Sequence, residues 1–378
     1  MNSYLLSVPV LAVALVSLSG LVLFAVGDTA PTAADAVASA LNREELVQGG
    51  VTARFDAEVE RTHPLRAAAL PLVATARYLF LRQGNSGVVV GREGWLFTNE
   101  EFQHHAQDEQ RLQRRLQYIE RVAEVLERRR GISLVVVVVP SKARVAAEYA
   151  PAYLESLVVH RRLPRAVAAL REAQITVVNA AETLRPDDFF RRDTHWRPGG
   201  ARRVAERVRQ AVAESDDWNG GGEFPGFGTS HRLFRGERRS LQGDLLSFVP
   251  VGVWREALGL TAEDYRPLVA EPIGADSGGA GLFDTPEIPL VLVGTSYSAD
   301  ERFGFESALR GALEGDLLNL AEPAGGPFQP MEAFLQGDTI SEIPPRIVIW
   351  EVPERYLTLP DTDAPGDPES VALDGRPW

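Results

Sequence analysis

Residues 132–139 form a run of apolar, mostly β-branched side chains that is broken only by Ser133. A strand that is apolar at successive positions is buried on both faces, as in the interior of a parallel sheet. Residues 112–126 before it carry apolar side chains at helical spacing, and residues 163–173 after it do the same. This strand between two amphipathic helices predicts an α/β fold with a mainly parallel sheet, covered by helices on both faces.

The alternation of strand and helix patterns continues toward the C-terminus. Strands are expected at residues 175–178, 289–293, 317–320 and 346–350, and helices at residues 198–212, 303–313 and 331–335. A glycine-bounded turn predicts a hairpin between residues 88–90 and 95–97. Residues 219–242 and 261–285 are rich in Gly, Pro and charge, and we expect them to be surface insertions that frame a substrate groove.

The N-terminus carries a long apolar segment. Residues 4–26 contain no charged side chain, and as a helix they would span about 35 Å, enough to cross a hydrocarbon layer of about 30 Å. We expect an uncleaved single-pass anchor in the cytoplasmic (inner) membrane of a bacterium, with the rest on the extracytoplasmic, periplasmic side. The predicted organisation is an anchor at residues 1–27, a juxtamembrane spacer with helices at 28–86, a catalytic domain at 87–359 and a disordered tail at 360–378.

Charge and composition exclude several classes of function. The net charge of -13 argues against nucleic acid as a partner, because binding of phosphates requires a basic face. The absence of cysteine excludes disulfides, thiolate metal sites and a cysteine nucleophile. The 6 histidines are scattered, with no pair at the spacing of metal ligands on one helical face. The sequence therefore predicts no metal site and no cofactor.

Ser296 is the candidate nucleophile. It lies in residues 290–298, LVLVGTSYS, where an apolar strand ends at a glycine and is followed by a turn into a helix. In parallel α/β sheets ligands bind at the carboxyl ends of the strands, and a serine in such a turn has a backbone N–H beside it for an oxyanion. Taken alone, the same pattern also suits a Ser or Thr helix cap.

Asp193 and His195 are the candidate partners of this serine. They lie two residues apart before the helix predicted from Pro198, and side chains at that spacing share one face of an extended segment. Asp193 could then orient the imidazole while His195 accepts the serine proton. An acidic cap with a packed histidine is the alternative. Because all three members of an Asp, His and Ser triad occur at strand ends or helix entries, we predict a catalytic triad.

Other polar and aromatic residues near these segments are candidates for substrate contacts. Lys142 follows the strand at residues 132–139 and could bind an anionic group, although a solvated lysine is the simpler expectation. The full set of predicted substrate-binding residues is Lys142, Trp196, Arg197, Tyr297, Arg302 and Glu354. Arg302 and Tyr297 are candidates for the second oxyanion donor. Arg191, Arg192 and Arg197 could form a basic groove for an anionic polymer, or be scattered surface arginines.

Six short motifs occur in a fixed order over residues 88–357. They are GREGWLF (91–97), PSKARV (140–145), RDTHW (192–196), GDLLSF (243–248), VGTSYS (293–298) and WEVPERYL (350–357). In this combination the sequence resembles the alginate O-acetyltransferase family, the AlgJ/AlgX type of SGNH hydrolase-like proteins. The resemblance implies an SGNH-like αβα sandwich in which the Asp-His pair precedes the serine, with Ser296 as nucleophile, His195 as base and Asp193 as its orienting partner.

The resemblance also implies what the protein acts on and with. It implies periplasmic transfer of acetyl groups to hydroxyls of an exported polysaccharide, alginate-like or another exopolysaccharide. The acetyl group would come from a multispanning membrane O-acyltransferase. Two alternatives remain open: a carbohydrate acetylesterase with the same triad, and a non-catalytic scaffold of a polysaccharide export complex that keeps the fold but not the reaction.

Overall fold

The computed structural model describes residues 66–151, 157–215, 226–273 and 288–360. These divide into two compact units, and the smaller comprises the described residues up to Ser86 together with Ser247–Thr261. In it, helix α5 (Arg66–Ala76) runs into a π-helical turn, η1 (Arg77–Leu81), and the Asn85 backbone N–H donates to the Phe248 carbonyl at 2.7 Å.

The larger unit comprises Gly87–Leu246 and the residues from Ala262 onward, and it is built on a parallel sheet of five strands. The strand order is β10-β9-β11-β3-β4, and every neighbouring pair is parallel. The strands are β3 (Ser133–Val139), β4 (Thr176–Asn179), β9 (Leu290–Val293), β10 (Leu317–Asn319) and β11 (Ile347–Pro353). This confirms the predicted α/β fold with a parallel sheet.

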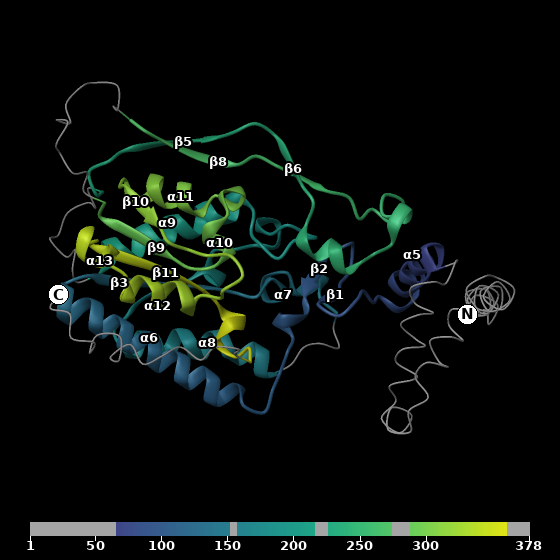
Figure 1. The fold of residues 1–378 in the computed structure, drawn as a ribbon, viewed down its shortest axis with the longest axis horizontal. Helices are drawn as coiled ribbons and strands as arrows, with labels where there is room; N and C mark the ends of the chain where they lie inside the picture. The colour runs from purple at the N-terminus through teal and green to yellow at the C-terminus, as the bar shows by residue number, and fades with distance from the viewer. Residues whose placement is uncertain (1–65, 152–156, 216–225, 274–287, 361–378) are drawn as a thin grey trace, which may run out of the picture. The chain divides into compact units, whose positions relative to one another are not determined.

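Helices cover both faces of this sheet (Figure 1). Alternate side chains of β3 point to opposite faces, which is why the apolar run at residues 132–139 has no polar side. Val135, Val137 and Val139 enter one hydrophobic core together with the apolar faces of α9 (Pro198–Glu214) and α11 (Phe305–Leu313). Leu134, Val136 and Val138 enter a second core, formed with α6 (Asp108–Arg130), α8 (Leu157–Glu172) and α12 (Phe328–Gln336). The result is a three-layer αβα arrangement.

Antiparallel ribbons complete the larger unit. The predicted hairpin is confirmed, because β1 (Val88–Val90) pairs with β2 (Leu96–Thr98). The described parts of the two predicted insertions pair with each other: β5 (His231–Arg235) with β8 (Leu268–Pro272), and β6 (Arg239–Leu241) with β7 (Glu263–Tyr265). The β5-β8 ribbon packs on α11, where an added Cβ at Gly311 would lie 2.4 Å from the Leu233 side chain.

The predicted membrane anchor lies outside the described residues, as do most of the predicted spacer and all but the first residue of the tail predicted at residues 360–378. Within the described ranges, no helix has both the length and the apolar character needed to cross a membrane.

Candidate active site

Ser296, His195 and Asp193 meet at the carboxyl-terminal edge of the sheet. Ser296 is the first residue of the short helix α10 (Ser296–Ala299), which follows β9. Asp193 and His195 lie in a loop closed by a bridge between Phe189 and Trp196, just before α9 begins. All carboxyl ends of a parallel sheet lie along one edge, which brings side chains 101 residues apart in the sequence together.

The three side chains form one hydrogen-bonded chain. The His195 Nε2 atom lies 2.7 Å from Ser296 Oγ, and His195 Nδ1 lies 2.7 Å from Asp193 Oδ1. A carboxylate only accepts hydrogen bonds, so Nδ1 carries the proton and Nε2 presents its lone pair to the serine hydroxyl. This is the arrangement that a general base needs to withdraw a proton from a hydroxyl nucleophile.

The Asp193 carboxylate is held by several donors. Its Oδ1 also accepts the His195 backbone N–H at 3.0 Å, and its Oδ2 accepts the Asp244 backbone N–H at 3.0 Å. Burial alone would raise the pKa of Asp193, but the hydrogen bonds from His195 and Asp244 lower it below its ordinary value. Asp193 is therefore a carboxylate at neutral pH, as the Nδ1–H tautomer of His195 requires.

The GDLLSF motif supports the loop that carries Asp193. The Asp244 carboxylate accepts the Thr194 backbone N–H at 2.9 Å, so the two segments are bonded in both directions. A Cβ at Gly243 would lie 2.0 Å from the Arg192 carbonyl oxygen, which explains why glycine stands there. Burial and the neighbouring Asp193 raise the pKa of Asp244.

Aromatic rings enclose the imidazole of His195, and this side chain is 11% exposed. The Phe303 ring stacks on it with centroids 4.0 Å apart, and the Tyr297 ring packs at 4.7 Å. These contacts restrict rotation of the imidazole, so that Nε2 stays directed at Ser296.

Glu351 on β11 fixes the turn that carries Ser296. Its Oε2 accepts the Thr295 backbone N–H at 2.8 Å, the Thr295 hydroxyl at 2.9 Å and the Ser298 hydroxyl at 3.1 Å. Burial raises the pKa of Glu351 above its ordinary value, and these hydrogen bonds offset only part of that rise. The close fit explains Gly294, because a Cβ there would lie 2.6 Å from Glu351 Oε2.

Lys142 does not reach the surface, contrary to the prediction of a substrate contact and to the simpler expectation of a solvated lysine. It is fully buried, and its Nζ donates to the carbonyls of Leu96 at 2.6 Å, Arg191 at 3.0 Å and Asp193 at 2.8 Å. Burial lowers its pKa from 10.5 to about 8, although Glu101 and Asp193 oppose that shift. Three motifs thus meet at one ammonium group: GREGWLF, PSKARV and RDTHW.

Lys142 is also the only lysine in the chain, since 38 of the 39 basic side chains are arginine. An ammonium presents three donors in a tetrahedral arrangement, whereas the planar guanidinium group cannot meet three converging carbonyls in the same way. The arrangement of the carbonyls therefore explains why lysine stands at this position. Its uniqueness in the composition was a signal that sequence reasoning missed.

Glu354 is likewise buried and does not line an open groove, in contrast to the prediction. Its Oε1 accepts the Ser141 backbone N–H at 2.7 Å and Arg144 Nε at 2.9 Å, while its Oε2 accepts Arg144 Nη2 at 2.9 Å. It joins the end of β11 to the start of α7 (Lys142–Val145).

Trp196 and Tyr297 are also fully buried, and the Tyr297 hydroxyl donates to the Thr194 carbonyl at 2.7 Å. That hydroxyl is engaged and cannot serve as the second oxyanion donor.

Arg302 and Arg197 are the predicted substrate contacts that remain solvent-accessible. Arg302 Nε donates to the Asp300 carboxylate at 2.8 Å, and its guanidinium lies 5.5 Å from the Phe303 ring, at the rim of the triad. Arg197 forms an ion pair with Glu263 at 2.5 Å. Its charge is thus partly neutralised.

The three arginines predicted to form a basic groove do line one pocket, of about 400 Å³, beside Trp95. Glu263 pairs with two of them, Arg192 and Arg197, and Asp264 lines the same pocket. Arg191 lies over the Trp95 ring at 6.0 Å. Of the two readings left open by the sequence, the three arginines are gathered at one pocket, where Glu263 and Asp264 offset part of their charge.

Within the described ranges, one group of carboxylates and imidazole could hold a cation: Asp193, His195 and Asp244, with ligand atoms within 4.8 Å of one another. Each of these side chains already has a hydrogen-bond partner. Asp193 and His195 bond to each other, and the Asp244 carboxylate accepts the Thr194 backbone N–H. The group fits a hydrogen-bond network better than a metal site.

The fold and this constellation define an α/β domain of serine-hydrolase type, with a Ser-His-Asp hydrogen-bonded chain at the edge of a parallel sheet. Over residues 88–354 the chain matches the family described as SGNH hydrolase-like domain, acetyltransferase AlgX. The chain belongs to this family. Its relatives include proteins named probable alginate O-acetylase AlgJ and alginate biosynthesis protein AlgX.

Known relatives resemble the chain along most of its length. It is 36% identical over 343 residues to the probable alginate O-acetylase AlgJ of Pseudomonas aeruginosa, covering 86% of this chain and 85% of that protein. The solved O-acetyltransferase domain of Pseudomonas putida AlgJ has 32% identity and a TM-score of 0.65, over 76% of this chain and 97% of that domain. Pseudomonas aeruginosa AlgX, at 23% identity and a TM-score of 0.53, shares the fold.

Proposed function

We propose that this protein is an extracytoplasmic O-acetyltransferase that moves an acetyl group through acetyl-Ser296 onto hydroxyls of an exported polysaccharide, alginate or a related polymer. The observation that carries the proposal is the hydrogen-bonded chain from Asp193 through His195 to Ser296, with both links at 2.7 Å. Membership of the acetyltransferase family supports the choice of acyl group, and the name of the AlgJ relative supports the choice of polymer.

In the first half-reaction, Ser296 Oγ attacks the carbonyl carbon of an acetyl donor, and its proton passes to His195 Nε2. Asp193 stabilises the resulting imidazolium through Nδ1–H. The backbone N–H of Ser296 stabilises the oxyanion of the tetrahedral intermediate. When the intermediate collapses, the leaving group takes the proton from His195 Nε2, and the acetyl group remains on Ser296.

In the second half-reaction, a sugar hydroxyl attacks the acetyl carbon and gives its proton to His195 Nε2. Collapse of this intermediate breaks the bond to Ser296 Oγ, which takes the proton back. One ester bond forms as another breaks, so the transfer is redox-neutral.

The anchor at residues 1–27 would hold this domain at the outer face of the inner membrane, where a multispanning O-acyltransferase could supply the acetyl group. The apolar length of residues 4–26 supports the anchor. Fractionation of cells that express the full chain tests this: the protein should stay with membranes after a high-salt wash, and a chain starting at residue 28 should be soluble.

The test of the reaction compares Ser296→Ala with Ser341→Ala, which removes an exposed hydroxyl on α13 (Thr339–Glu342). Each purified variant is incubated with a small acetyl ester, with and without oligosaccharide. Wild type and Ser341→Ala should form acetylated sugar, and Ser296→Ala should form none. Transfer by Ser296→Ala would refute the nucleophile, acetate release regardless of sugar would indicate an esterase, and inactivity of all variants would indicate a scaffold.

A further inference from the structure

The smaller unit exposes an apolar surface. Of the large apolar side chains that are exposed within the described ranges, all but Phe234 and Ile273 belong to this unit, although it makes up a minor part of those ranges. They lie on α5, on η1 and on a short 3-10 helix, η9 (Gly252–Trp254). The most exposed members are Leu70, Phe80, Leu81 and Val253, at 53%, 60%, 60% and 89%. The exposed apolar side chains of α5, η1 and η9 are called the apolar surface below.

Packing within the unit brings α5 and η9 together. A Cβ at Gly252 would lie 3.1 Å from the Pro71 side chain, so the two helices lie against each other at this point. The chain neighbours of these residues, Leu72 and Val253, are both exposed. The exposed side chains of the two segments are therefore close together. Soluble proteins seldom expose a contiguous apolar patch unless it binds a partner or a membrane.

Helix α5 has no polar face. After Arg66 its only polar side chain is that of Thr75. A helix that is apolar on all sides is ordinarily buried in protein or in a membrane, yet Leu70, Leu72 and Val73 are exposed. Its 11 residues reach only about 16 Å, roughly half of a hydrocarbon layer of about 30 Å. The helix is too short to cross a bilayer, but its length does not prevent it from lying along the surface of one.

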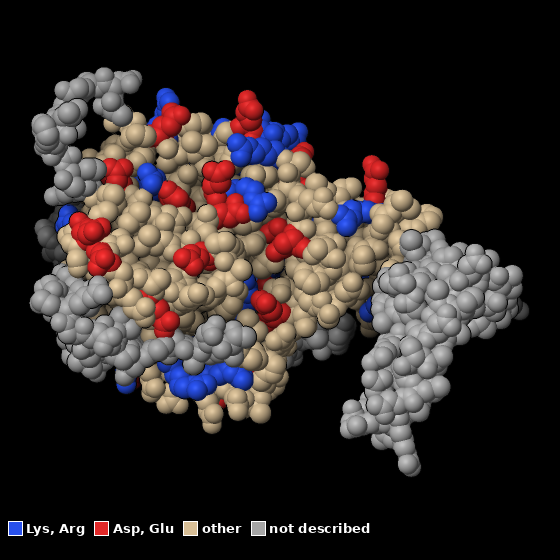
Figure 2. Space-filling view, viewed as in Figure 1, with Lys and Arg blue, Asp and Glu red and all other residues tan. Residues whose placement is uncertain are grey.

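The charges beside the apolar surface favour an anionic partner. Residues 66–86 contain Arg66, Arg77 and Arg82 but no Asp or Glu, in a chain whose net charge is -13. Arg77 begins η1 and Arg82 follows its end, and both side chains are exposed. On the face drawn in Figure 2, by contrast, acidic and basic side chains are interspersed. Exposed apolar side chains with arginines at both ends, and Trp254 on the neighbouring helix, are typical of a contact with anionic lipid.

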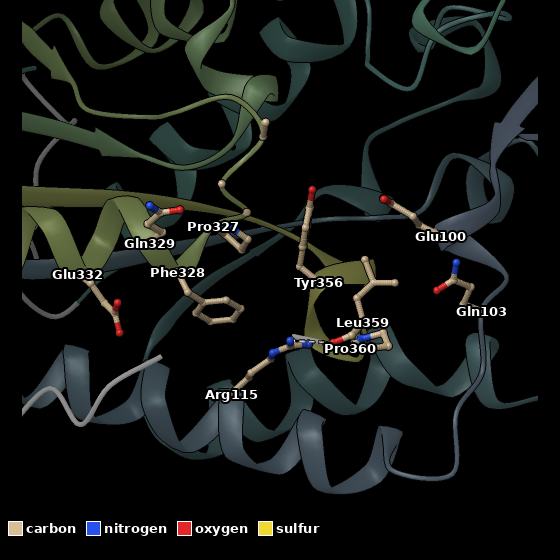
Figure 3. A pocket seen from close by; sticks show the side chains of 13 residues that line it. Glu100, Gln103, Arg115, Pro327, Phe328, Gln329, Glu332, Tyr356, Leu359 and Pro360 are labelled. Carbon is tan, nitrogen blue, oxygen red and sulfur yellow. Dashed lines mark hydrogen bonds between the residues drawn. The ribbon is translucent and has the colours of Figure 1, made fainter. Parts of the chain in front are cut away.

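A polar cavity beside α12 in the larger unit gives no comparable signal (Figure 3). Its volume is about 620 Å³. Arg115 in its wall donates to the Leu359 carbonyl at 2.8 Å, and Glu100 accepts Arg355 Nε at 2.9 Å. These charged groups have partners within the protein, whereas the exposed apolar side chains of η1 still face solvent.

We propose that the apolar surface docks on a bilayer that contains anionic phospholipid, with Phe80, Leu81 and Trp254 entering the lipid interface and Arg77 and Arg82 at the headgroup phosphates. The smaller unit is the first described part of the chain after the anchor predicted at residues 1–27, so the anchor would hold it near lipid. That last argument rests on the proposed anchor, whereas the exposure and the charge pattern do not.

The docking contact supplements the anchor and does not replace it. Its electrostatic part is screened by salt, so a high-salt wash should release a chain held by this surface alone.

The test uses the absence of cysteine, because one introduced thiol then carries one probe. Full-length Phe80→Cys is labelled with an environment-sensitive dye and reconstituted into vesicles of phosphatidylglycerol and phosphatidylcholine. The dye should be quenched by brominated lipid and shielded from iodide present on both sides of the bilayer. Val253→Cys places a second probe on η9 and should behave in the same way. Ser341→Cys, exposed on α13 in the larger unit, is the matched control and should be quenched by iodide only.

A second set of variants tests the role of charge. With the dye on Phe80→Cys, Arg82→Gln should lower the ratio of docked to undocked protein about fivefold, the loss expected for one arginine near an anionic surface. Arg161→Gln, which removes an exposed arginine of α8, is the control and should leave that ratio unchanged. Vesicles of phosphatidylcholine alone should weaken the contact in the wild-type background.

Three results would overturn the docking. Quenching of the Phe80→Cys and Val253→Cys dyes by iodide but not by lipid would show that the surface faces water. Quenching by neither would show that another segment of the chain or a protein partner covers it. Equal effects of Arg82→Gln and Arg161→Gln would refute the preference for anionic lipid.

Retention on vesicles after a high-salt wash reports the anchor separately. Lipid quenching at low salt without such retention would refute the anchor and leave the docking standing. Acetyl transfer to oligosaccharide by the same preparations measures the proposed reaction independently of both.

Discussion

Replacing Lys142 by Met removes the ammonium group while keeping an unbranched side chain of similar length. In the structure this ammonium is the shared donor to three backbone carbonyls, of which one belongs to Asp193. The substitution removes this donor from the Leu96 and Asp193 carbonyls, whereas the Arg191 carbonyl still accepts the Leu96 backbone N–H at 2.8 Å. It also leaves the Glu101 carboxylate, which interacts electrostatically with Lys142, without that neighbouring charge.

The size of the effect follows from two opposing contributions. Each buried carbonyl that loses its donor costs about 1–3 kcal/mol. Against this, burial lowers the pKa of Lys142 from 10.5 to about 8, so removing the charge relieves about 3 kcal/mol at neutral pH. For the two carbonyls that lose their donor the cost is about 2–6 kcal/mol, so we expect a net loss of up to about 3 kcal/mol in the free energy of unfolding of Lys142→Met. Lys142→Arg should not restore stability, because the larger planar group does not fit the three acceptors.

The pH dependence of the unfolding free energy gives a clearer test of this assignment. Between about pH 8 and 10.5 the unfolded chain holds a proton on Lys142 that the folded chain has released. Stability contributed by this group therefore rises with pH across that window and is constant below it. Lys142→Met should lack this rise. Because the chain has no other lysine, the difference between the two curves reports this one side chain.

Urea unfolding followed by tryptophan fluorescence, at pH 7 and at pH 9.5, measures both effects. The unfolding free energy of the wild type should rise between about pH 8 and 9.5 relative to that of Lys142→Met. The unfolding free energy of the variant should change less with pH. Equal unfolding free energies at pH 7, together with parallel pH curves, would refute the assignment of Lys142 as the buried support of the Asp193 loop.

Two further predictions concern the triad. Asp193→Asn should lower kcat by about 10³–10⁴-fold, because an amide does not select the Nδ1–H tautomer of His195, and the measurement is the rate of acyl transfer. The folded pKa of Asp193 is below its ordinary value of 3.8, so its carboxylate stabilises the folded wild type above that pH, and this contribution is lost as the pH falls below it. Asp193→Asn should lack this contribution at every pH. Gly294→Ala places a Cβ 2.6 Å from Glu351 Oε2 and should cost about 1–3 kcal/mol, whereas Gly199→Ala, with its nearest atom at 4.0 Å, should cost nothing measurable by thermal unfolding.

Most of the fold could be predicted from local patterns. The apolar run at residues 132–139 is β3, and the helix before it ends where Gly131 adopts the left-handed conformation, with φ of 63°. The helix expected from residue 163 begins earlier, at Leu157, and Pro164 lies inside it. The apolar spacing used for the prediction starts at Leu163, so the pattern alone places the start too late.

The meeting of Ser296 and His195 could also be predicted, because a parallel sheet aligns its carboxyl ends. The buried polar network behind them could not. Lys142 and Glu354 follow strands, where charged side chains are ordinarily solvated, and their partners lie 49 and 213 residues away. Glu351 did offer a signal, since a carboxylate within the apolar strand β11 must have partners to remain buried. Such partners are non-local, and no periodicity in the sequence encodes them.

The central claim is that Ser296 carries the acetyl group during transfer. Brief exposure of the purified wild-type protein to an acetyl donor without acceptor, followed by acid quenching and peptide mass spectrometry, measures this directly. The account predicts one acetyl group on the peptide that contains Ser296, lost when oligosaccharide is added and absent from His195→Ala. Acetylated sugar formed at full rate with no acetyl group on Ser296 would contradict it.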